Sequence, residues 1–355
     1  TRGVRGQPRG SRDRLSASQA SSRAAIVRRC SSPCGRSGDS IPLYERQIQI
    51  ARSICDRRGE AVATGNLANA WIALSDWAAG REAARRAATI YREIGSVGGV
   101  AMCDNALGNL DLWDGRYARA ATSFTAAQSA IRSLGMLMYA ATPATNLGRC
   151  LALLGEIANA RRVLREALDL ATESGIAKDQ GYALQWLGDT HEWSGDLGEA
   201  EQLSRRALDV RRASGQLAGA AESLLALGRV LAARGDTESA RSTLRQAADL
   251  AAQHSYDDVH VMALALLAAG SCDSVHEALR GVETANLSTG TRLHCRPLLW
   301  QATHDRAHLI EAKRLLNDLL SKNPPEHHPA MLTNVRVNRE IVAACRAEGI
   351  GFGSA

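Results

Sequence analysis

The chain has 355 residues, of which 45% are hydrophobic, 23% are charged and only 4% are aromatic. Few aromatic residues, together with abundant Ala, Leu and Arg, argue against a sheet protein and predict an all-α fold. The net charge of +6 arises in residues 1–40, which contain nine Arg and only two acidic residues, Asp13 and Asp39. The rest of the chain is therefore nearly neutral and lacks the basic stripe of a nucleic-acid-binding protein.

The eight Cys follow no regular spacing, and a chain of this length buries a core without disulfides, so we expect free thiols in a reducing compartment. No apolar run approaches the roughly 18 residues of a membrane-spanning helix, and no signal peptide opens the chain. We therefore expect a cytoplasmic location and no membrane partner.

Residues 1–40 are rich in Arg, Ser and Gly and have almost no periodicity, which predicts a disordered linker. Their composition also resembles an organelle transit segment. We favour the linker, because the chain begins at Thr1 instead of Met and we expect it to be a fragment of a protein with an upstream domain. The pair Cys30 and Cys34 could ligate a metal, but no second pair lies nearby.

An apolar set within 41–58, including Leu43, Ile48 and Ile54, predicts a helix that is the second half of an earlier repeat. Five regular hairpins follow at a step of 40 residues, at 60–94, 100–134, 140–174, 180–214 and 220–254. In the fourth, Gly195-Asp196 predicts the turn and Gly215 a left-handed helix cap.

Small residues recur at this 40-residue step in every hairpin. One position of each first helix is Gly or Ala: Ala68, Gly108, Gly148, Gly188 and Gly228. Two small-residue positions recur in the second helices. The earlier one holds Gly80, Ala120, Ala160, Ala200 and Ala240, and the later one holds Ala87, Ala127, Ala167, Ala207 and Ala247. Such residues let two helix backbones approach closely and leave room for a larger Leu. One hairpin cannot bury both apolar stripes, so the copies must stack.

This pattern of Leu-Gly in the first helix, Ala twelve residues after the Gly and a second Ala seven further on resembles the tetratricopeptide repeat. Each copy is six residues longer than the 34-residue form, similar to repeats of polarity scaffolds and bacterial signalling proteins. The resemblance implies a right-handed superhelical solenoid of antiparallel helix pairs whose first helices line a concave groove.

Beyond Tyr256 the period weakens, and 255–323 reads as degenerate helical repeats: one shortened pair over 261–282 and another over 293–320. Residues 324–355 contain Pro324-Pro325 and then one amphipathic helix from Met331 to Val342. We expect this helix to cap the last repeat.

No known catalytic constellation is present. A phosphate-binding G-x-x-x-x-G-K-[ST] loop is missing, and the HDRAH motif with His304 and His308 lacks the continuous helix that a zinc site of this kind needs, since Asp305 falls near a turn. A zinc site is one explanation for the nearby Cys272, His276, His294 and Cys295. Ordinary packing of the repeats is the other. We expect no catalytic residue, no metal and no cofactor.

The face of each first helix that points away from its partner helix carries polar residues. The nine candidate partner-binding residues on it are Asn69, Asn105, Asn109, Trp113, Arg149, Gln185, Asp189, Trp193 and Arg229. Asn amides can bond the backbone of an extended peptide, and Arg149 and Arg229 can fork onto a carboxylate or phosphate. An ordinary solvated face is the alternative for the polar residues, and gap filling between hairpins for the two Trp.

We therefore expect a non-enzymatic scaffold that binds a protein or peptide partner in its groove. The alternative is the regulatory or sensor region of a larger signalling protein, such as a bacterial Ser/Thr kinase or a nucleotide-binding transcription regulator.

Overall fold

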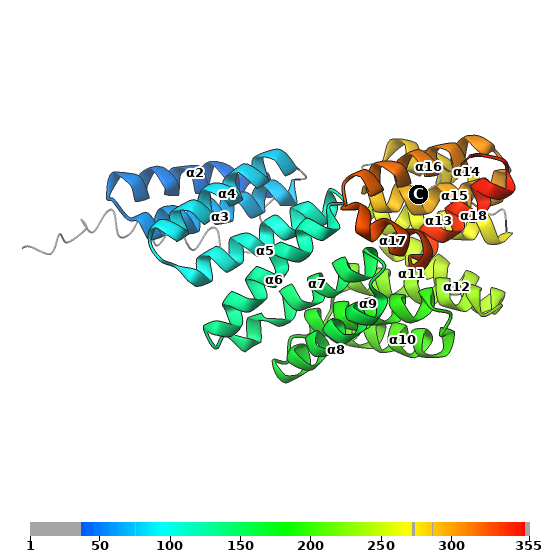
Figure 1. Cartoon of the computed structure of the whole chain (residues 1–355), viewed down its shortest axis with the longest axis horizontal. Helices are drawn as coiled ribbons and strands as arrows, with labels where there is room; N and C mark the ends of the chain where they lie inside the picture. Colours follow the sequence, from blue (N-terminus) through cyan, green and yellow to red (C-terminus); the bar gives the residue numbers. More distant parts are fainter. Residues whose placement is uncertain (1–36, 75, 272–273, 286, 352–355) are drawn as a thin grey trace, which may run out of the picture. The chain divides into compact units, whose positions relative to one another are not determined.

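The computed structural model describes residues 37–74, 76–271, 274–285 and 287–351, and within these ranges it contains seventeen α-helices and no β-strand (Figure 1). The predicted all-α fold is confirmed. The chain divides into two compact units, Thr1–Gly99 and Val100–Ala355. Residues 1–36, which include most of the expected linker and the Cys30–Cys34 pair, lie outside the described residues.

The first unit contains α2 (Ser37–Ser53), α3 (Arg57–Ala73), α4 (Trp77–Glu93) and the start of α5 (Val97–Trp113). α3 packs against both α2 and α4. Glu60 is buried in α3, where Arg52 and Arg57 lie 2.8 and 2.6 Å from its carboxylate. The helix expected over 41–58 is wrong at its end, because Cys55 has a positive φ of 56° and interrupts it before α3 begins.

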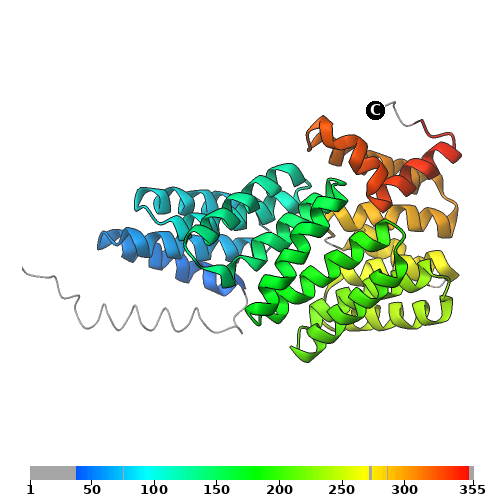
Figure 2. The same ribbon diagram turned by 60° about the horizontal axis from the view of Figure 1, so that its bottom comes forward.

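The second unit continues with pairs of helices that lie side by side in chain order from α7 to α12 (Figure 2). Its elements are α6 (Tyr117–Ser133), the 3₁₀ turn η1 (Leu137–Tyr139), α7 (Ala141–Leu153), α8 (Ile157–Glu173), α9 (Ala177–Trp193), α10 (Leu197–Ala213), α11 (Leu217–Ala233), α12 (Thr237–Gln253), α13 (Asp257–Ser271), α14 (Val275–Thr284), α15 (Thr289–Thr303), α16 (Arg306–Ser321), the 3₁₀ turn η2 (Pro325–His327), α17 (His328–Asn334) and α18 (Arg336–Ala347).

Three residues separate α9 from α10 and set the geometry of the hairpin. Ser194 ends α9, Gly195 adopts a φ of +84° that side chains with a Cβ avoid, and Asp196 caps α10 by accepting the Glu199 N–H at 3.4 Å. Gly215 is left-handed as well, with a φ of +69°. The predicted turn and cap are therefore confirmed.

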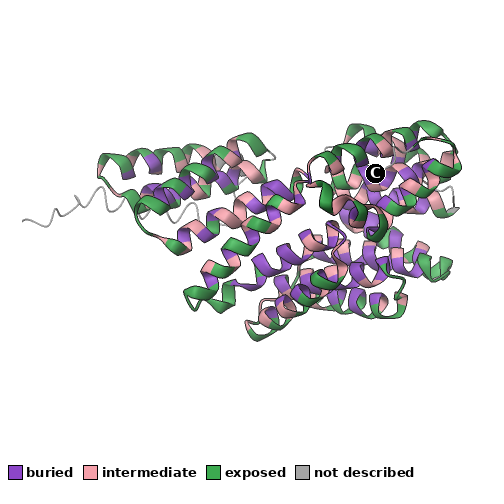
Figure 3. Cartoon of the chain, viewed as in Figure 1, coloured by how far each residue is buried: buried purple, intermediate pink, exposed green. Residues whose placement is uncertain are grey.

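The small residues of the repeat are helix-crossing points, as the sequence predicts. A Cβ built on Gly108, Gly148 or Gly228 of a first helix would lie 2.8, 2.5 or 2.7 Å from a large side chain sixteen residues later, namely Phe124, Leu164 or Leu244. Ala167 and Ala207 are completely buried. The buried residues face neighbouring helices along the stacked pairs (Figure 3).

The C-terminal helices depart from the sequence prediction. The single helix expected from Met331 to Val342 is wrong, because Val335 has an extended backbone with ψ of 116° and separates α17 from α18. Val335 is 2% exposed and packs in a core cluster with Leu184, Leu187 and Trp193 of α9. Burial against a helix far away in sequence accounts for the break.

Candidate functional site

Five helices of the second unit, each the first helix of its pair, contribute side chains to one cavity of about 300 Å³. These helices are α7, α9, α11, α13 and α15. The other side of the cavity is formed by the α5–α6 turn and by residues of α16 and α18. Residues separated by one or two repeats recur in the lining: Tyr182, Glu222 and Met262 are 40 residues apart, and Arg149 and Arg229 are 80 apart. The 40-residue period of the sequence therefore lines up equivalent side chains along the cavity.

Arg149 projects from α7 and lies over the Trp186 ring, with its guanidinium carbon 5.0 Å from the ring centroid. Its Nε atom is buried and has no hydrogen-bond acceptor among the described residues. Within that same part of the chain, no carboxylate comes within 4.0 Å of this guanidinium. Arg149 is thus a cation held in place by an aromatic ring, with hydrogen-bonding capacity left unused.

Beneath the cavity, Arg211 of α10 is completely buried. It donates to Gly219 O and Ser223 Oγ, both at 2.8 Å, and its guanidinium lies 4.7 Å from the Tyr182 ring centroid. Glu222 forms an ion pair with it at 3.3 Å. Burial lowers the pKa of Arg211 and raises the pKa of Glu222.

Gln185, one of the predicted site residues, lines the cavity and accepts a hydrogen bond from Arg211. The space for Arg211 comes from two glycines, since a Cβ on Gly181 or Gly219 would lie 2.8 or 2.7 Å from its Nε. The Arg211 side chain therefore fixes both Tyr182 and Gln185 in the cavity wall.

Two further predicted site residues, Asp189 and Arg229, form an ion pair with each other. Arg229 also donates to Glu192 through Nε, at 2.8 and 3.0 Å, and the Glu192 side chain is fully buried and paired with Arg336 of α18 as well. Burial raises the pKa of Asp189, and the two carboxylates raise the pKa of Arg229 against the opposing effect of its own burial. The fork of Arg229, expected to meet a partner, is occupied inside the chain.

The three predicted asparagines, Asn69, Asn105 and Asn109, are not among the residues that line the cavity. Asn109 accepts from Asn146 at 3.2 Å, Asn105 is half-buried with an Oδ1 that has no hydrogen-bond partner within the described ranges, and Asn69 is exposed in the first unit. The two tryptophans of the predicted column differ. Trp113 lines the cavity and is 43% exposed, whereas Trp193 is 8% exposed and packs edge-on against Trp186 at 6.3 Å.

Sequence reasoning missed Trp186, Glu222, Asp258, His294 and Asn338 as cavity residues. Stepping by 40 from Tyr182 finds Glu222. His294 and Asn338 lie in the degenerate region, where no repeat register marks the inner face.

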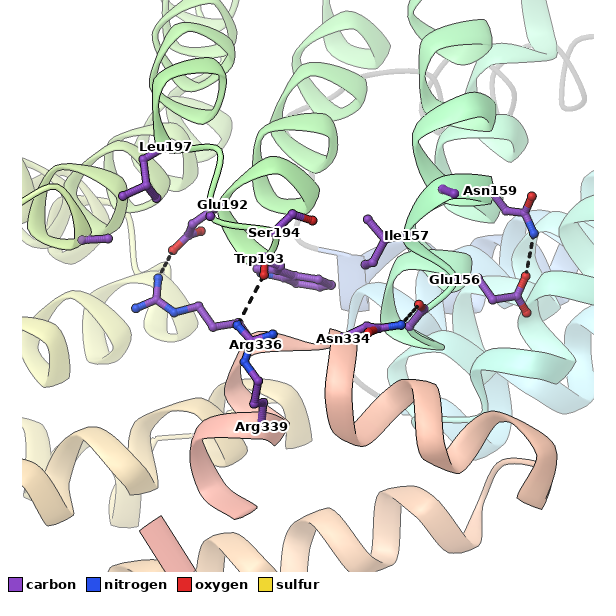
Figure 4. A pocket seen from close by; sticks show the side chains of 14 residues that line it. Glu156, Ile157, Asn159, Glu192, Trp193, Ser194, Leu197, Asn334, Arg336 and Arg339 are labelled. Carbon is purple, nitrogen blue, oxygen red and sulfur yellow. Dashed lines mark hydrogen bonds and ion pairs between the residues drawn. The ribbon is translucent and has the colours of Figure 1, made fainter. Parts of the chain in front are cut away.

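A second hollow, of about 740 Å³, lies where the α17–α18 corner meets the turns after α7 and α9 (Figure 4). Asn334 donates to Gly155 O at 2.9 Å, and Arg339 donates to Trp193 O at 3.3 Å. A Cβ on Gly155 would lie 2.3 Å from Ala330 O. The C-terminal helices are thus attached to repeats about 150 residues or more earlier in the chain.

The residues weighed for zinc do not form one cluster. His304 ends α15 in a left-handed conformation, Asp305 caps α16, and the His308 ring contacts Arg296 at 3.1 Å, while Cys272 lies outside the described residues. The described residues hold no group of three or more His, Cys, Asp and Glu placed to bind a metal ion. In the same residues, no helix is long and apolar enough to cross a membrane.

The similarity to known protein families lies in the regular helical repeats. A tetratricopeptide-repeat family model matches residues 180–253, which span α9 to α12. No curated protein sequence matches the chain.

Solved structures share its fold. The Rap conjugation gene regulator of plasmid pLS20, in complex with the Phr* peptide, is 16% identical with a TM-score of 0.59, covering 86% of this chain and 80% of the regulator. NprR in complex with its cognate peptide NprX is 14% identical with a TM-score of 0.59, covering 85% and 84%.

A third similar structure is larger. It is a signal transduction ATPase with numerous domains and a tetratricopeptide repeat sensor, from Pyrococcus horikoshii, which is 12% identical with a TM-score of 0.52. The match covers 93% of this chain and 49% of the ATPase. The family model thus places tetratricopeptide repeats at residues 180–253, and these structures share the TPR-like helical solenoid fold of this chain.

Proposed function

We propose that the second unit binds a segment of a protein or peptide partner in the cavity lined by α7, α9, α11, α13 and α15, without catalysing a reaction. The single observation that carries this proposal is Arg149, a cation on the cavity wall whose Nε has no acceptor and whose guanidinium is held against Trp186. A buried donor without a partner costs free energy, which a ligand carboxylate or carbonyl recovers.

The arrangement of the cavity supports a peptide ligand over a flat protein surface. Aromatic side chains, Trp113, Tyr182 and Trp186, offer apolar area next to a few polar groups, which is typical of small concave sites. The structures of similar fold that were determined with the Phr* and NprX peptides support the same class of ligand. A cytoplasmic location, and a partner that is neither nucleic acid nor membrane, belong to this proposal.

Selection from a random linear heptapeptide library, followed by calorimetry on synthetic peptides, tests it. Arg149→Ala removes a charge-assisted hydrogen bond of about 1.5–3 kcal/mol and should weaken binding about 10- to 150-fold. The matched control is Arg165→Ala, which removes the same charge from an exposed site on α8 outside the cavity lining. Equal affinity in both variants, or no selected peptide, contradicts the proposal.

The second candidate is the sensor region of a larger signalling protein. The similarity to the repeat sensor of a multidomain signal transduction ATPase favours it, because 93% of this chain aligns with 49% of that protein. Sequencing the genomic reading frame upstream decides between the two. A kinase glycine-rich loop or a phosphate-binding loop there supports the sensor region, and an adjacent start codon supports a free adaptor.

A further inference from the structure

The two ends of the cavity differ in charge. At the α7 end, Arg149 forms no ion pair in the described part of the chain, and its guanidinium lies over the Trp186 ring. This end therefore carries a positive charge outside any ion pair, beside apolar area.

At the α11–α13 end, the lining contains two carboxylates, Glu222 and Asp258. Glu222 is compensated by Arg211 at 3.3 Å. Asp258 accepts from the Ser288 N–H at 3.0 Å and from its hydroxyl at 3.1 Å, both through Oδ1, and no cation of the described residues forms an ion pair with it. One negative charge is therefore left at this end.

His294, which also lines the cavity, does not cancel that charge. Burial, together with the positive charges of Arg229 and Arg336, lowers the pKa of His294 to about 4, so its ring is neutral near pH 7. The remaining cations near the cavity are committed, because Arg229 and Arg336 share the Asp189 and Glu192 carboxylates.

Two lining residues also carry buried polar atoms with no hydrogen-bond partner within the described residues. They are a donor, Arg149 Nε, and an acceptor, Asn338 Oδ1. Asn338 is 1% exposed and uses only its Nδ2, which donates to Met331 O at 3.0 Å. An unused donor and an unused acceptor in the lining of one cavity match a ligand that supplies both, as a peptide does.

We propose that the cavity is specific for a short dipolar peptide, with an acidic residue bound by Arg149 at the α7 end and a basic residue bound by Asp258 at the α11–α13 end. This inference rests on the proposed function and adds the chemical class and direction of the ligand. Peptides of a single sign of charge meet repulsion at one end, which provides specificity.

Defined pentapeptide pools test the inference. Four pools contain one Glu and one Arg, two Glu, two Arg, or two Gln at all pairs of positions, with neutral residues elsewhere. Bound peptides are quantified by equilibrium dialysis and mass spectrometry with the full chain. We expect the Glu/Arg pool to be enriched tenfold or more over the other three.

Two variants assign each end. Arg149→Gln should abolish the preference for Glu and keep the preference for Arg, and Asp258→Asn should do the reverse, since the Asn side chain still presents an oxygen to Ser288. Arg165→Gln and Asp257→Asn, both at exposed positions, are the matched controls.

The outcomes separate this inference from the proposed function. Binding without charge preference, or a preference that both cavity variants leave intact, overturns the dipolar ligand while peptide binding stands. If no pool binds, both proposals fail.

Discussion

At the scale of single residues, Glu192 explains why some polar positions of the inner face stabilise the fold. Its side chain is fully buried and is bonded by Arg229 from the next repeat and by Arg336 from α18. A buried ion pair contributes little net free energy compared with apolar packing, but removing one partner leaves an uncompensated charge. Arg229 is therefore needed for stability, whereas Arg149 forms no ion pair within the described residues.

Arg229→Met tests this assignment. It leaves Asp189 and Glu192 with one cation fewer, and we expect the free energy of unfolding, measured in urea, to fall by about 3–5 kcal/mol. The control is Arg205→Met, which breaks an exposed pair with Glu201 and should cost less than about 1 kcal/mol. Equal losses in the two variants would show that Arg229 is an ordinary surface cation.

The sequence predicts part of this site because the 40-residue step relates Arg149, Asp189 and Arg229. It does not predict which of these is already paired. Glu192 is three residues from Asp189 in the sequence, but its second partner, Arg336, lies 144 residues away. Contacts of that sequence separation leave no periodic signal.

At the scale of elements, the turn glycines have two different roles. Gly155 and Gly175 have positive φ values, 82° and 65°, so each helix can end within one residue. Of these two, Gly155 is the one that another element approaches, because the α17 backbone at Ala330 lies where a Cβ would be. The same local signal in sequence therefore marks both a turn and a docking point.

Gly155→Ala and Gly175→Ala separate these roles. Both changes impose left-handed strain of about 1–2 kcal/mol. Gly155→Ala also forces the Ala330 backbone away, and we expect it to lose a further ~1–3 kcal/mol in urea unfolding. Similar values for the two variants would contradict the close approach of α17.

At the scale of the second unit, the solenoid is not a simple series of nearest-neighbour repeats. Asn323, after α16, donates to Gly115 O at 2.8 Å and accepts from the Ala118 N–H at 3.1 Å. Asn334 attaches to Gly155 in the following repeat. Local pattern predicts the helices and turns, because these depend on neighbours in sequence. It cannot predict such closure, which depends on how the repeats curve.

Closure should make the unfolding of this unit cooperative across the sequence, unlike an open repeat array, whose ends unfold independently. Amide hydrogen exchange, read by mass spectrometry, should give similar opening free energies for α17–α18 and for α7–α9. In the double variant Asn323→Ala/Asn334→Ala, exchange of α17–α18 should become faster by tenfold or more, while α11–α12 stay protected. Asn159→Ala, which removes an exposed bond to Glu156, is the control. If α17–α18 exchange early in the unaltered protein, they are a peripheral cap, and the Asn323 and Asn334 contacts do not hold the unit closed.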